Sequence, residues 1–259
     1  MSTFTTMIIE ERYRKILDIV KEKRTVSYAE LASLLYCSMS TARRDVEAMS
    51  QRNLIEKVHN GAAYIEGNAS ESPSLIRESE HVREKRAIAA LAKRFVTPGI
   101  TMFLDSSTTC AQLIPYMNGI PNLVAITNGL ENALLLSTNG VEVYMPGGML
   151  FPRNNAITGA ETLAFLSRYA PDVFFFSTRG LSLDGRLSEG NDSTRATKGA
   201  MLRKAKRKIL LIDSSKFDKT FFAESCTLAD VDVLVTDAPL PDELQALCSS
   251  LGVEVLWPE

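Results

Sequence analysis

Ser-Met-Ser-Thr-Ala-Arg-Arg-Asp-Val, residues 38–46, is the stretch that decides the fold of the N-terminal part of this chain. At 100° per residue, four apolar side chains fall on one face of a helix: Met39, Ala42, Val46 and Met49. Arg44 falls on the opposite face and Arg43 on its flank, while Ser38 is well suited to cap the helix. The stretch predicts a helix that packs by one face and presents hydroxyls and arginines on the other.

Two further helices precede this one. Residues 8–23 carry apolar side chains three and four positions apart, which predicts an amphipathic helix. Ser27 and Glu30 have the spacing of a capping box at the start of a second helix. Tyr36 and Cys37 then form the turn into the third helix, and Cys37 is interpreted as a small turn or core residue rather than a sensor.

A hairpin is expected after the third helix. Asn60-Gly61, the strongest short hairpin signal, lies between residues 55–59 and 62–65. Helix, turn, helix and hairpin together are the layout of a winged helix that reads DNA, here placed at residues 1–66. We expect six residues to contact double-stranded DNA: Ser38, Ser40, Thr41, Arg43, Arg44 and Lys57. An isolated Arg-Arg pair more often only solvates a helix, but the complete frame reverses that preference.

Composition limits the alternatives. The first 66 residues carry 10 Lys and Arg against 9 Asp and Glu, so this region has a net charge of only +1. We therefore expect its affinity for DNA to depend on where its charges lie. We also expect it to depend on the presence of more than one copy in a homo-oligomer, a dimer or tetramer. The four cysteines form no metal-binding pattern, so neither a metal nor a cofactor is expected. Free thiols and the lack of a signal peptide or membrane span favour the cytoplasm.

The remainder of the chain has a different pattern. Residues 67–74 are short, polar and contain Pro73, which predicts a linker before a second domain at residues 75–259. A charged helix is expected over residues 75–95. Apolar runs that end in small polar residues then alternate with helical stretches, which predicts a parallel α/β sheet covered on both faces. The expected strands are residues 100–104, 123–126, 141–145, 172–176, 208–212 and 231–235.

Ligands of such sheets bind beyond the carboxyl ends of the strands, where the small polar residues lie. Residues 105–109, Asp-Ser-Ser-Thr-Thr, follow a strand and open a helix, which suits an anion. The predicted effector-binding residues are Asp105, Ser106, Ser107, Thr108, Thr109, Thr127, Asn128, Gly147, Gly148, Arg179, Lys198 and Lys216. Hydroxyl donors beside lysines would take a phosphate, and Asp105 would take sugar hydroxyls.

Simpler interpretations exist for several of these residues. The Ser-Ser-Thr-Thr run taken alone is more often a helix cap, and Lys198 taken alone is as often a solvated helix residue. Because polar residues also lie at the other strand ends, a ligand pocket is the better interpretation of the Ser-Ser-Thr-Thr run. Phe174, Phe175 and Phe176 are interpreted as buried strand rather than as a stacking platform.

The chain resembles the DeoR family of bacterial transcription regulators. Ten residues satisfy the family's N-terminal signature: Arg12, Ile16, Val20, Ser38, Thr41, Ala42, Arg43, Arg44, Asp45 and Val46. The family's Leu-Asp-Ser-Gly-Thr-Thr is matched by residues 104–109, and Asp213-Ser-Ser-Lys-Phe217 matches as well. The resemblance implies an N-terminal winged helix-turn-helix and a C-terminal sensor domain similar in fold to ribose-5-phosphate isomerase and the coenzyme A transferases.

Four positions depart from the family pattern. Lys57 stands where the family usually has Arg, and Asn60-Gly61 replaces a common Gly-Gly. Ser107 replaces the usual Gly of the loop, which would alter how closely backbone approaches a phosphate. Arg179 stands where a small residue is more frequent and is expected to be specific to the ligand of this chain.

Three functions fit these patterns. The favoured one is a transcription regulator, a repressor of carbohydrate metabolism genes controlled by a phosphorylated sugar, and not an enzyme. A sugar-phosphate isomerase is the second, with Glu131 or Glu189 as the conceivable base, although neither lies in a recognisable catalytic run. A winged helix that binds proteins instead of DNA is the third, and Arg43 and Arg44 disfavour it.

Overall fold

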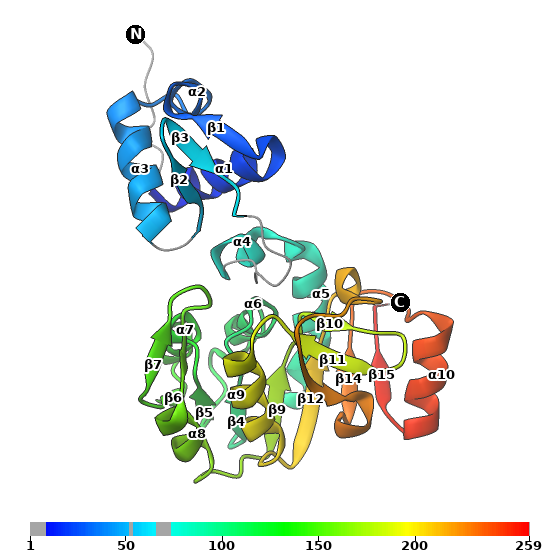
Figure 1. Ribbon diagram of the computed structural model, residues 1–259. Coiled ribbons are helices and arrows are strands. Elements are labelled where there is room, and N and C mark those ends of the chain that lie inside the picture. The colour runs from blue at the N-terminus through cyan, green and yellow to red at the C-terminus, as the bar shows by residue number, and fades with distance from the viewer. Residues whose placement is uncertain (1–8, 52–53, 66–73, 259) are drawn as a thin grey trace. The chain divides into compact units, whose positions relative to one another are not determined.

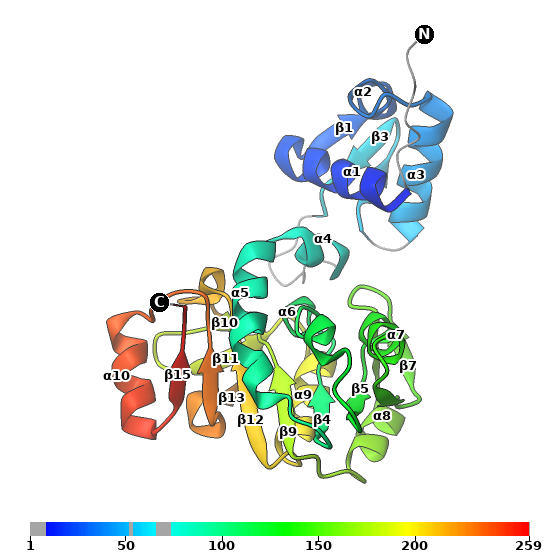
Figure 2. The same cartoon turned by 180° about the vertical axis from the view of Figure 1, so that it is seen from behind.

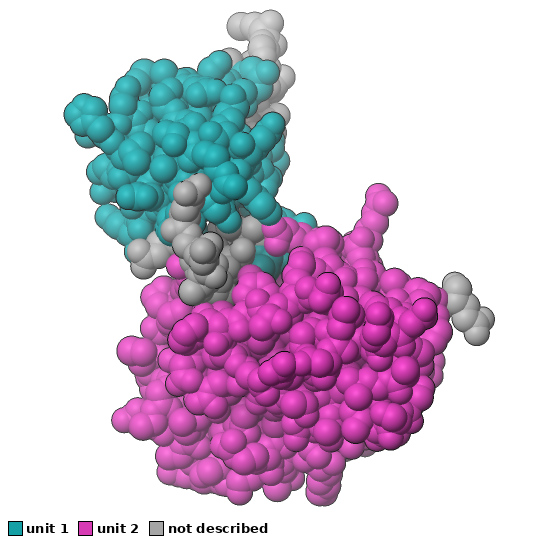
Figure 3. Space-filling view, turned by 45° about the vertical axis from the view of Figure 1, so that its right-hand side comes forward, with its two compact units in different colours: residues 1–79 teal, residues 80–259 magenta. Residues whose placement is uncertain are grey.

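The computed structural model describes residues 9–51, 54–65 and 74–258. The chain forms two compact units, residues 1–79 and residues 80–259, coloured separately in Figure 3. Of the predicted linker, residues 67–73 lie outside the described residues, and Ser74 is already the first residue of a helix. In the part of the chain that the structure describes, no helix is long and apolar enough to cross a membrane.

The first unit contains the predicted three helices. They are α1 (Ile9–Lys23), α2 (Tyr28–Leu34) and α3 (Met39–Gln51). Ser27 caps α2, because its hydroxyl accepts the backbone N–H of Glu30 at 3.2 Å. The second half of the expected capping box is absent, since the Glu30 carboxylate instead binds the Lys23 ammonium at 2.6 Å. Ala42, Val46 and Met49 of α3 are fully buried, as the periodicity predicts.

A three-stranded antiparallel sheet completes this unit, in the order β1 (Thr25–Ser27), β3 (Gly61–Ala63), β2 (Glu56–Val58). The sequence pattern predicted the hairpin of β2 and β3 but not β1, which is too short to show an alternating pattern. Core residues from all three helices and the sheet pack together, among them Ile16, Leu31 and Ile55.

The hairpin turn lies one residue earlier than predicted. Val58 pairs with Gly61, so the two loop residues are His59 and Asn60 instead of Asn60 and Gly61. Gly61 belongs to β3 and lies against β1, where a Cβ atom would approach the Val26 carbonyl oxygen to 1.9 Å. The glycine is therefore required for close approach of a neighbouring strand, and the turn does not use its conformational freedom.

The charged helix expected over residues 75–95 is also broken. It consists of α4 (Ser74–Ser79) and α5 (Val82–Ala92), followed by a 3-10 turn, Lys93–Phe95. His81 adopts the left-handed conformation with φ 53°, which interrupts the helix between the two pieces. The boundary between the two units falls at the same place, between Ser79 and Glu80.

The second unit is built on a seven-stranded sheet in which every neighbouring pair is parallel. In order across the sheet, the strands are β15 (Glu254–Leu256), β14 (Val233–Val235), β12 (Arg207–Leu211), β9 (Val173–Phe176), β4 (Thr101–Leu104), β5 (Val124–Thr127) and β6 (Glu142–Tyr144). Six of these strands match predicted ones, and β15 was not predicted.

The strand order places a switch point at the centre of the sheet. The chain begins with β4, adds β5 and β6 on one side, and then returns to place β9 on the other side of β4. Connections on the two sides therefore diverge from the β4–β9 pair, where Leu104 lies opposite Phe175. In an open parallel sheet this is where a ligand crevice forms.

Helices cover both faces, and each face has its own core. Met102, Leu104 and Phe175 point to the face covered by α5 and α6 (Thr108–Ala111), whereas Phe174 and Phe176 point to the other. Figures 1 and 2 show the two covers from opposite sides. All three phenylalanines are fully buried, which confirms their assignment to a buried strand. The remaining helices are α7 (Leu130–Thr138), α8 (Ala160–Leu166), α9 (Asp192–Leu202) and α10 (Asp242–Leu251).

Short elements that the sequence pattern did not predict lie beside this sheet. One is an antiparallel pair, β7 (Met149–Phe151) and β8 (Ala156–Thr158). The other is an antiparallel sheet of β10 (Gly180–Leu181), β11 (Arg186–Glu189) and β13 (Ala223–Thr227). Three further 3-10 turns occur at Ile114–Met117, Ser214–Lys216 and Leu228–Asp230.

Candidate DNA-reading surface and effector site

The predicted DNA-contacting side chains gather at the N-terminal part of α3 and are accessible. Ser38, Ser40, Arg43 and Arg44 are exposed, and Thr41 is half-buried. The Ser38 hydroxyl caps the helix, accepting the Thr41 N–H at 3.1 Å, and lies 2.8 Å from both the Ser40 and Thr41 hydroxyls. The result is a cluster of hydroxyls at the helix start, with two arginines one turn further on.

Met39 differs from its prediction. It was expected on the packing face, but 56% of its surface is exposed. Met39 is the first residue of α3, and side chains in a helix tilt toward its N-terminus. Its side chain therefore leans toward the turn, where Tyr36 is 83% exposed, instead of toward the core. The sequence pattern did not identify these two apolar side chains as part of the exposed surface.

A partly buried ion pair fixes α3 to α1. The Arg12 guanidinium binds the Asp45 carboxylate through two hydrogen bonds, Nε to Oδ2 at 2.5 Å and Nη2 to Oδ1 at 2.9 Å. Asp45 is 5% exposed. The hydrogen bond to Asp45 raises the pKa of Arg12, so the guanidinium stays charged. Because Asp45 directly follows Arg43 and Arg44, the pair sets the orientation from which the two arginines project.

Lys57 of the hairpin is the sixth predicted contact. Its side chain is exposed and its ammonium binds the Glu47 carboxylate of α3. The pair joins the hairpin to α3 and partly neutralises the Lys57 charge. The hairpin residue His59 is exposed as well.

In the second unit, Asp105 lies at the switch point and organises the strand ends. Its Oδ1 accepts the N–H of Ser107 at 2.9 Å, and its Oδ2 accepts the N–H of Ser177 at 3.0 Å. One buried carboxylate thus holds the residues after β4 and those after β9 together. The side chain is 5% exposed, so sugar hydroxyls would meet an oxygen that is already hydrogen-bonded.

We refer to residues 105–109 as the effector loop. Ser106 and Ser107 are half-buried, and Thr108 and Thr109 are buried. Ser107 has φ −75° and ψ 147°, which any residue adopts, so the serine in place of the family glycine causes no strain. Its hydroxyl caps α6 by accepting the Cys110 N–H at 3.2 Å.

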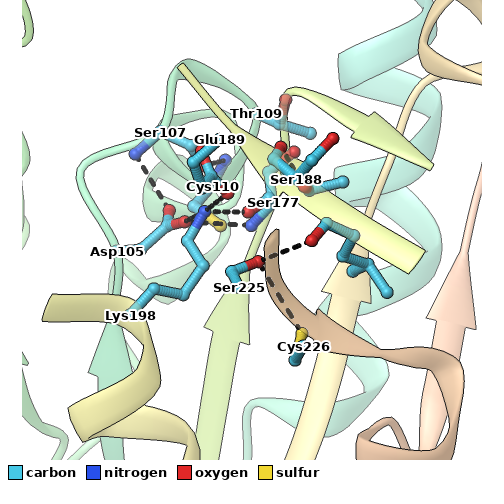
Figure 4. Close-up of polar contacts among 12 residues, drawn as sticks. Asp105, Ser107, Thr109, Cys110, Ser177, Ser188, Glu189, Lys198, Ser225 and Cys226 are labelled. Carbon is cyan, nitrogen blue, oxygen red and sulfur yellow. Dashed lines mark hydrogen bonds and ion pairs between the residues drawn. The ribbon is translucent and has the colours of Figure 1, made fainter. Parts of the chain in front are cut away.

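Lys198 lies at the centre of a buried charge cluster, drawn in Figure 4. The ammonium binds the Glu189 carboxylate and the Ser177 carbonyl oxygen, and lies 3.5 Å from Asp105 Oδ2. Burial by itself lowers the pKa of Lys198, but the charges of Glu189 and Asp105 outweigh it and hold the pKa above its usual range. Lys198 is 5% exposed, so its interpretation as a solvated helix residue is wrong.

Lys216 approaches the effector loop from the neighbouring strand end. Its ammonium lies 3.1 Å from the Ser177 hydroxyl, 3.4 Å from the Thr109 hydroxyl and 3.1 Å from Asp213 Oδ2. Burial by itself raises the pKa of Asp213, but the Lys216 charge, the hydrogen bonds from Ser215 and Lys216 and the Lys85 charge together lower it. The structure therefore brings Lys216, Thr109 and Asp105 to one edge of the sheet, as the spacing of the strands predicted.

Lys85 is a member of this site that the sequence interpretation missed. It is 3% exposed, and its ammonium donates to the Thr108 hydroxyl at 3.1 Å and to the Glu80 carbonyl oxygen at 2.8 Å. Its spacing could have revealed it, because Lys85 precedes the buried Ile88, Ala89 and Ala92 by three, four and seven residues. A lysine in register with the packing face of a helix must find a polar partner.

The polar residues at the end of β5 hold backbone in place. The Thr127 hydroxyl accepts the Gly129 N–H at 3.1 Å, and the Asn128 amide donates to the Ile157 carbonyl at 3.1 Å. Gly147 and Gly148 follow β6 and are exposed. Gly148 has φ 140°, and a Cβ atom there would approach the Thr158 carbonyl oxygen to 2.6 Å, so backbone geometry alone accounts for this glycine.

Arg179 follows β9 and is half-buried. Its guanidinium lies over the Phe221 ring, 5.3 Å from the centroid, and its buried Nε has no hydrogen-bond partner among the described residues. The structure thus places a cation near the strand ends, held by an aromatic ring from the segment that precedes β13.

Neither candidate base of an isomerase is arranged as a free base. Glu189 is 2% exposed and ion-paired to Lys198, and Glu131 accepts a hydrogen bond from the Asn155 amide at 2.8 Å.

The four cysteines are free thiols. Cys37 is half-buried beside the core of the first unit, and burial raises the pKa of Cys226 to about 12. Thiols of this kind stay protonated and unreactive.

A family model of known proteins matches each of the two units. The model of the DeoR-like helix-turn-helix domain matches residues 12–68, and that of the DeoR C-terminal sensor domain matches residues 80–238. The chain belongs to the DeoR family. It is accordingly a DNA-binding transcription regulator with an effector-sensing domain, and the family is not enzymatic.

Several curated relatives match this DeoR-family regulator along nearly its whole length. It is 31% identical over 257 residues to the HTH-type transcriptional repressor GlcR of Bacillus subtilis, covering 98% of each chain. It is 30% identical over 232 residues to the glycerol-3-phosphate regulon repressor of Escherichia coli, covering 89% of this chain and 92% of that one. Among solved structures, ribose 5-phosphate isomerase A from Methanocaldococcus jannaschii matches with a TM-score of 0.39 and 18% identity, over 51% of this chain and 53% of that chain.

Proposed function

We propose that this DeoR-family regulator represses carbohydrate metabolism genes from the cytoplasm and is released from its operator by a phosphorylated sugar. The observation that carries this proposal is the convergence of two lysine ammoniums on adjacent threonines of the effector loop, Lys85 on Thr108 and Lys216 on Thr109. Hydroxyl and ammonium donors at the switch point of a parallel sheet suit a phosphate group. Its relatives include a glycerol-3-phosphate regulon repressor.

The DNA contact is proposed to run through the start of α3. Ser38, Ser40 and Thr41 donate to phosphate or base edges, and Arg44 reads a base in the major groove with Arg43 beside it. Lys57 of the wing contacts phosphate. Exposure of these side chains, and the Arg12–Asp45 pair beneath them, support this assignment.

The DNA proposal is tested on an operator selected from random duplexes by the full-length protein. Replacing Arg44 with Ala should weaken binding to that operator by about 1–3 kcal/mol if Arg44 reads a base. Arg203, exposed just after α9 in the other unit, provides the matched control, because its replacement removes the same charge elsewhere. Unchanged operator affinity in both the Arg43→Ala and Arg44→Ala variants would exclude this reading surface.

The effector proposal places a phosphate on residues 106–109, with Lys216 neutralising its charge. Sugar hydroxyls lie toward Asp105 and Asn128, and the remaining strand-end residues, Thr127, Gly147, Gly148, Arg179 and Lys198, shape the site. Since Lys198 is already bound to Glu189, we assign it to holding the site together and not to direct neutralisation of the ligand.

Calorimetry with glucose 6-phosphate, fructose 1-phosphate and glycerol 3-phosphate tests the effector proposal. A phosphorylated sugar should bind, its unphosphorylated form should not, and operator affinity should fall by about 1–3 kcal/mol, with operator DNA weakening the sugar phosphate equally. In Thr108→Val, the operator affinities with and without ligand should become equal, so that their ratio falls to about one. Thr97→Val, at an exposed threonine that precedes β4, is the control and should keep that ratio. Equal binding of unphosphorylated sugars contradicts the proposal.

Assembly into a dimer or tetramer is proposed because two winged helices then meet two half-sites. The second unit has exposed apolar side chains at one end of its sheet, where Figure 1 shows α7, β6 and β7. They are Leu134, Leu135, Tyr144, Met149 and Leu150. We assign this surface to a second copy of the chain. Sedimentation should show a monomer for Leu134→Glu combined with Met149→Glu, and a monomeric wild type with full operator affinity would refute the assembly.

A further inference from the structure

We propose that Lys85 couples the effector loop to the point at which the chain enters the second unit. This inference rests on the proposed function, because it requires an anionic ligand on the effector loop. It adds a residue to the site and gives that residue a regulatory role. Lys85 binds the ligand phosphate and, in doing so, releases the Glu80 carbonyl oxygen.

The geometry attaches Lys85 both to the effector loop and to the start of the second unit. Its ammonium donates to the Thr108 hydroxyl of the effector loop at 3.1 Å and to the Glu80 carbonyl oxygen at 2.8 Å. Glu80 is the first residue of the second unit. One side chain, only 3% exposed, therefore spans the distance between the proposed ligand and the start of the unit.

The attachment at Glu80 is located where the backbone is interrupted. His81 follows with φ 53°, a left-handed conformation that costs energy in a residue other than glycine, and it provides no side-chain cap for α5. The surrounding contacts must therefore hold this conformation. The Lys85–Glu80 hydrogen bond is one such contact, and a second is the Lys85 N–H, which donates to the His81 carbonyl oxygen at 3.0 Å.

A phosphate on the effector loop changes what the ammonium prefers. Hydrogen bonds from lysine to an anionic oxygen are roughly twice as strong as bonds between neutral groups. A dianion beside Thr108 therefore attracts the ammonium away from the carbonyl oxygen of Glu80. The conformation at residues 80–81 then loses one of its supports, and the segment that leads to the DNA-reading unit is held less firmly.

The other two lysines of the site are not placed to do this. Lys198 binds Glu189, Asp105 and Ser177, and Lys216 contacts Asp213, Thr109 and Ser177. These partners all lie at the strand ends, whereas a bond of Lys85 reaches residue 80. Lys85 also helps to lower the pKa of Asp213, which places its charge close to the same site.

The test uses full-length protein, the selected operator, and glucose 6-phosphate, fructose 1-phosphate, glycerol 3-phosphate and inorganic phosphate as probes. For each variant, the readout is the ratio of operator affinities with and without saturating ligand, which typically spans about 5–150-fold in an allosteric protein. Lys85→Met preserves most of the side-chain volume and removes the charge. We expect it to bind the phosphorylated ligand roughly tenfold or more weakly, since a charged hydrogen bond is lost. The ratio itself should fall to less than about twofold.

Arg86→Met is the matched control, because it removes a positive charge from the next residue of α5, which is exposed. It should keep the wild-type ligand affinity and the wild-type ratio. If Lys85→Met does not fold, Lys85→Gln replaces it, since glutamine retains an N–H donor for Glu80 without the charge. The ratio of operator affinities should again fall to less than about twofold.

The outcomes separate this inference from the proposed function. If no probe binds the wild type, the proposed function is wrong, and the role of Lys85 is wrong with it because that role requires the ligand. If a sugar phosphate releases the wild type from DNA and releases Lys85→Met by the same factor, only the role of Lys85 is wrong. If Lys85→Met binds ligand weakly but is fully released at saturation, Lys85 is a ligand contact without a coupling role, and the inference is overturned.

Discussion

The two functional regions of this molecule hold their polar side chains in opposite ways. On α3, Ser38, Ser40, Arg43 and Arg44 are exposed, and one partly buried ion pair beneath them supplies the anchor. At the switch point of the second unit, Asp105, Glu189, Lys85 and Lys198 are each at most 5% exposed and bind to one another or to backbone. The polar side chains of the first region are therefore exposed to solvent, whereas those of the second region already form hydrogen bonds and ion pairs within the protein.

The difference follows from the two ligands. A DNA groove is read by side chains that reach out from the protein, so exposure is a requirement there. A small anion is recognised inside a protein, where charges interact strongly and must be neutralised by neighbours when the ligand is absent. Mutations in the first region should therefore affect binding, whereas mutations in the second should also affect stability. Four measurements examine this contrast.

The largest effect is expected at Lys198. Lys198→Met leaves Glu189 and Asp105 buried without their ammonium, which should cost about 3–5 kcal/mol of unfolding free energy. The sole tryptophan, Trp257, belongs to the second unit, so its fluorescence during urea unfolding reports on this unit. Lys204→Met, at an exposed lysine, should change little. A Lys198→Met protein as stable as the control would mean that the buried cluster is not held by its charges.

The second effect concerns the anchor beneath the exposed surface. Asp45→Ala removes the charged partner of Arg12 and should lower the stability of the first unit by about 1.5–3 kcal/mol, the usual value of a hydrogen bond to a charged group. Its thermal unfolding is followed by circular dichroism on the full chain. Exchange of the two charges, Arg12→Asp with Asp45→Arg, should restore part of the loss. No recovery in the exchanged protein would indicate that shape, and not charge, decides this contact.

A smaller effect is expected in the wing, where Lys57 is bound to Glu47. Lys57→Ala should weaken DNA binding about equally for all sequences and reduce the salt slope by about 1. Glu47→Gln should act in the opposite direction, because it releases the ammonium for phosphate. Electrophoretic shifts over a range of salt concentrations measure both. Identical salt slopes in the two variants would remove Lys57 from the interface.

The smallest effect is expected at an exposed pair of the second unit. Hydrogen bonds from Lys206 and Thr101 lower the pKa of Asp172 from 3.8 to about 2. Because the folded pKa is depressed, this contribution to stability is present above about pH 4 and is lost as the pH falls toward 2. The carboxylate is partly exposed, so the contribution should stay below about 1 kcal/mol. Asp172→Asn should lower the urea midpoint at about pH 6 but not at about pH 2, and an equal loss at both values would contradict this assignment.

Some features could be predicted from the sequence because they depend on neighbours along the chain. The burial of Ala42, Val46 and Met49 follows from helical periodicity, and the caps of Ser27 and Ser38 follow from local hydrogen bonding. Where a distant segment decided the outcome, the prediction failed. Gly61 was assigned to a turn, but its position is set by β1, a strand that lies far earlier in the chain.

The site of the second unit shows the same limit. Polar residues after several strands could be expected to meet, since parallel strands end at one edge of a sheet. Which of them face each other depends on the order of the strands, and it is the β4–β9 adjacency that joins Asp105 to Ser177. Lys85 and Glu189 enter the site from α5 and β11, outside the main sheet.

The sequence by itself determined the identity of the elements: three helices with a wing, a parallel sheet, exposed arginines, and hydroxyls at the strand ends. These depend on the spacing of side chains within a few turns or strands. Only the tertiary structure decided which charges are buried together, since burial depends on packing between segments far apart in the chain. Lys198 illustrates this, because a lysine on a helix surface and a lysine paired with two buried carboxylates have the same local sequence.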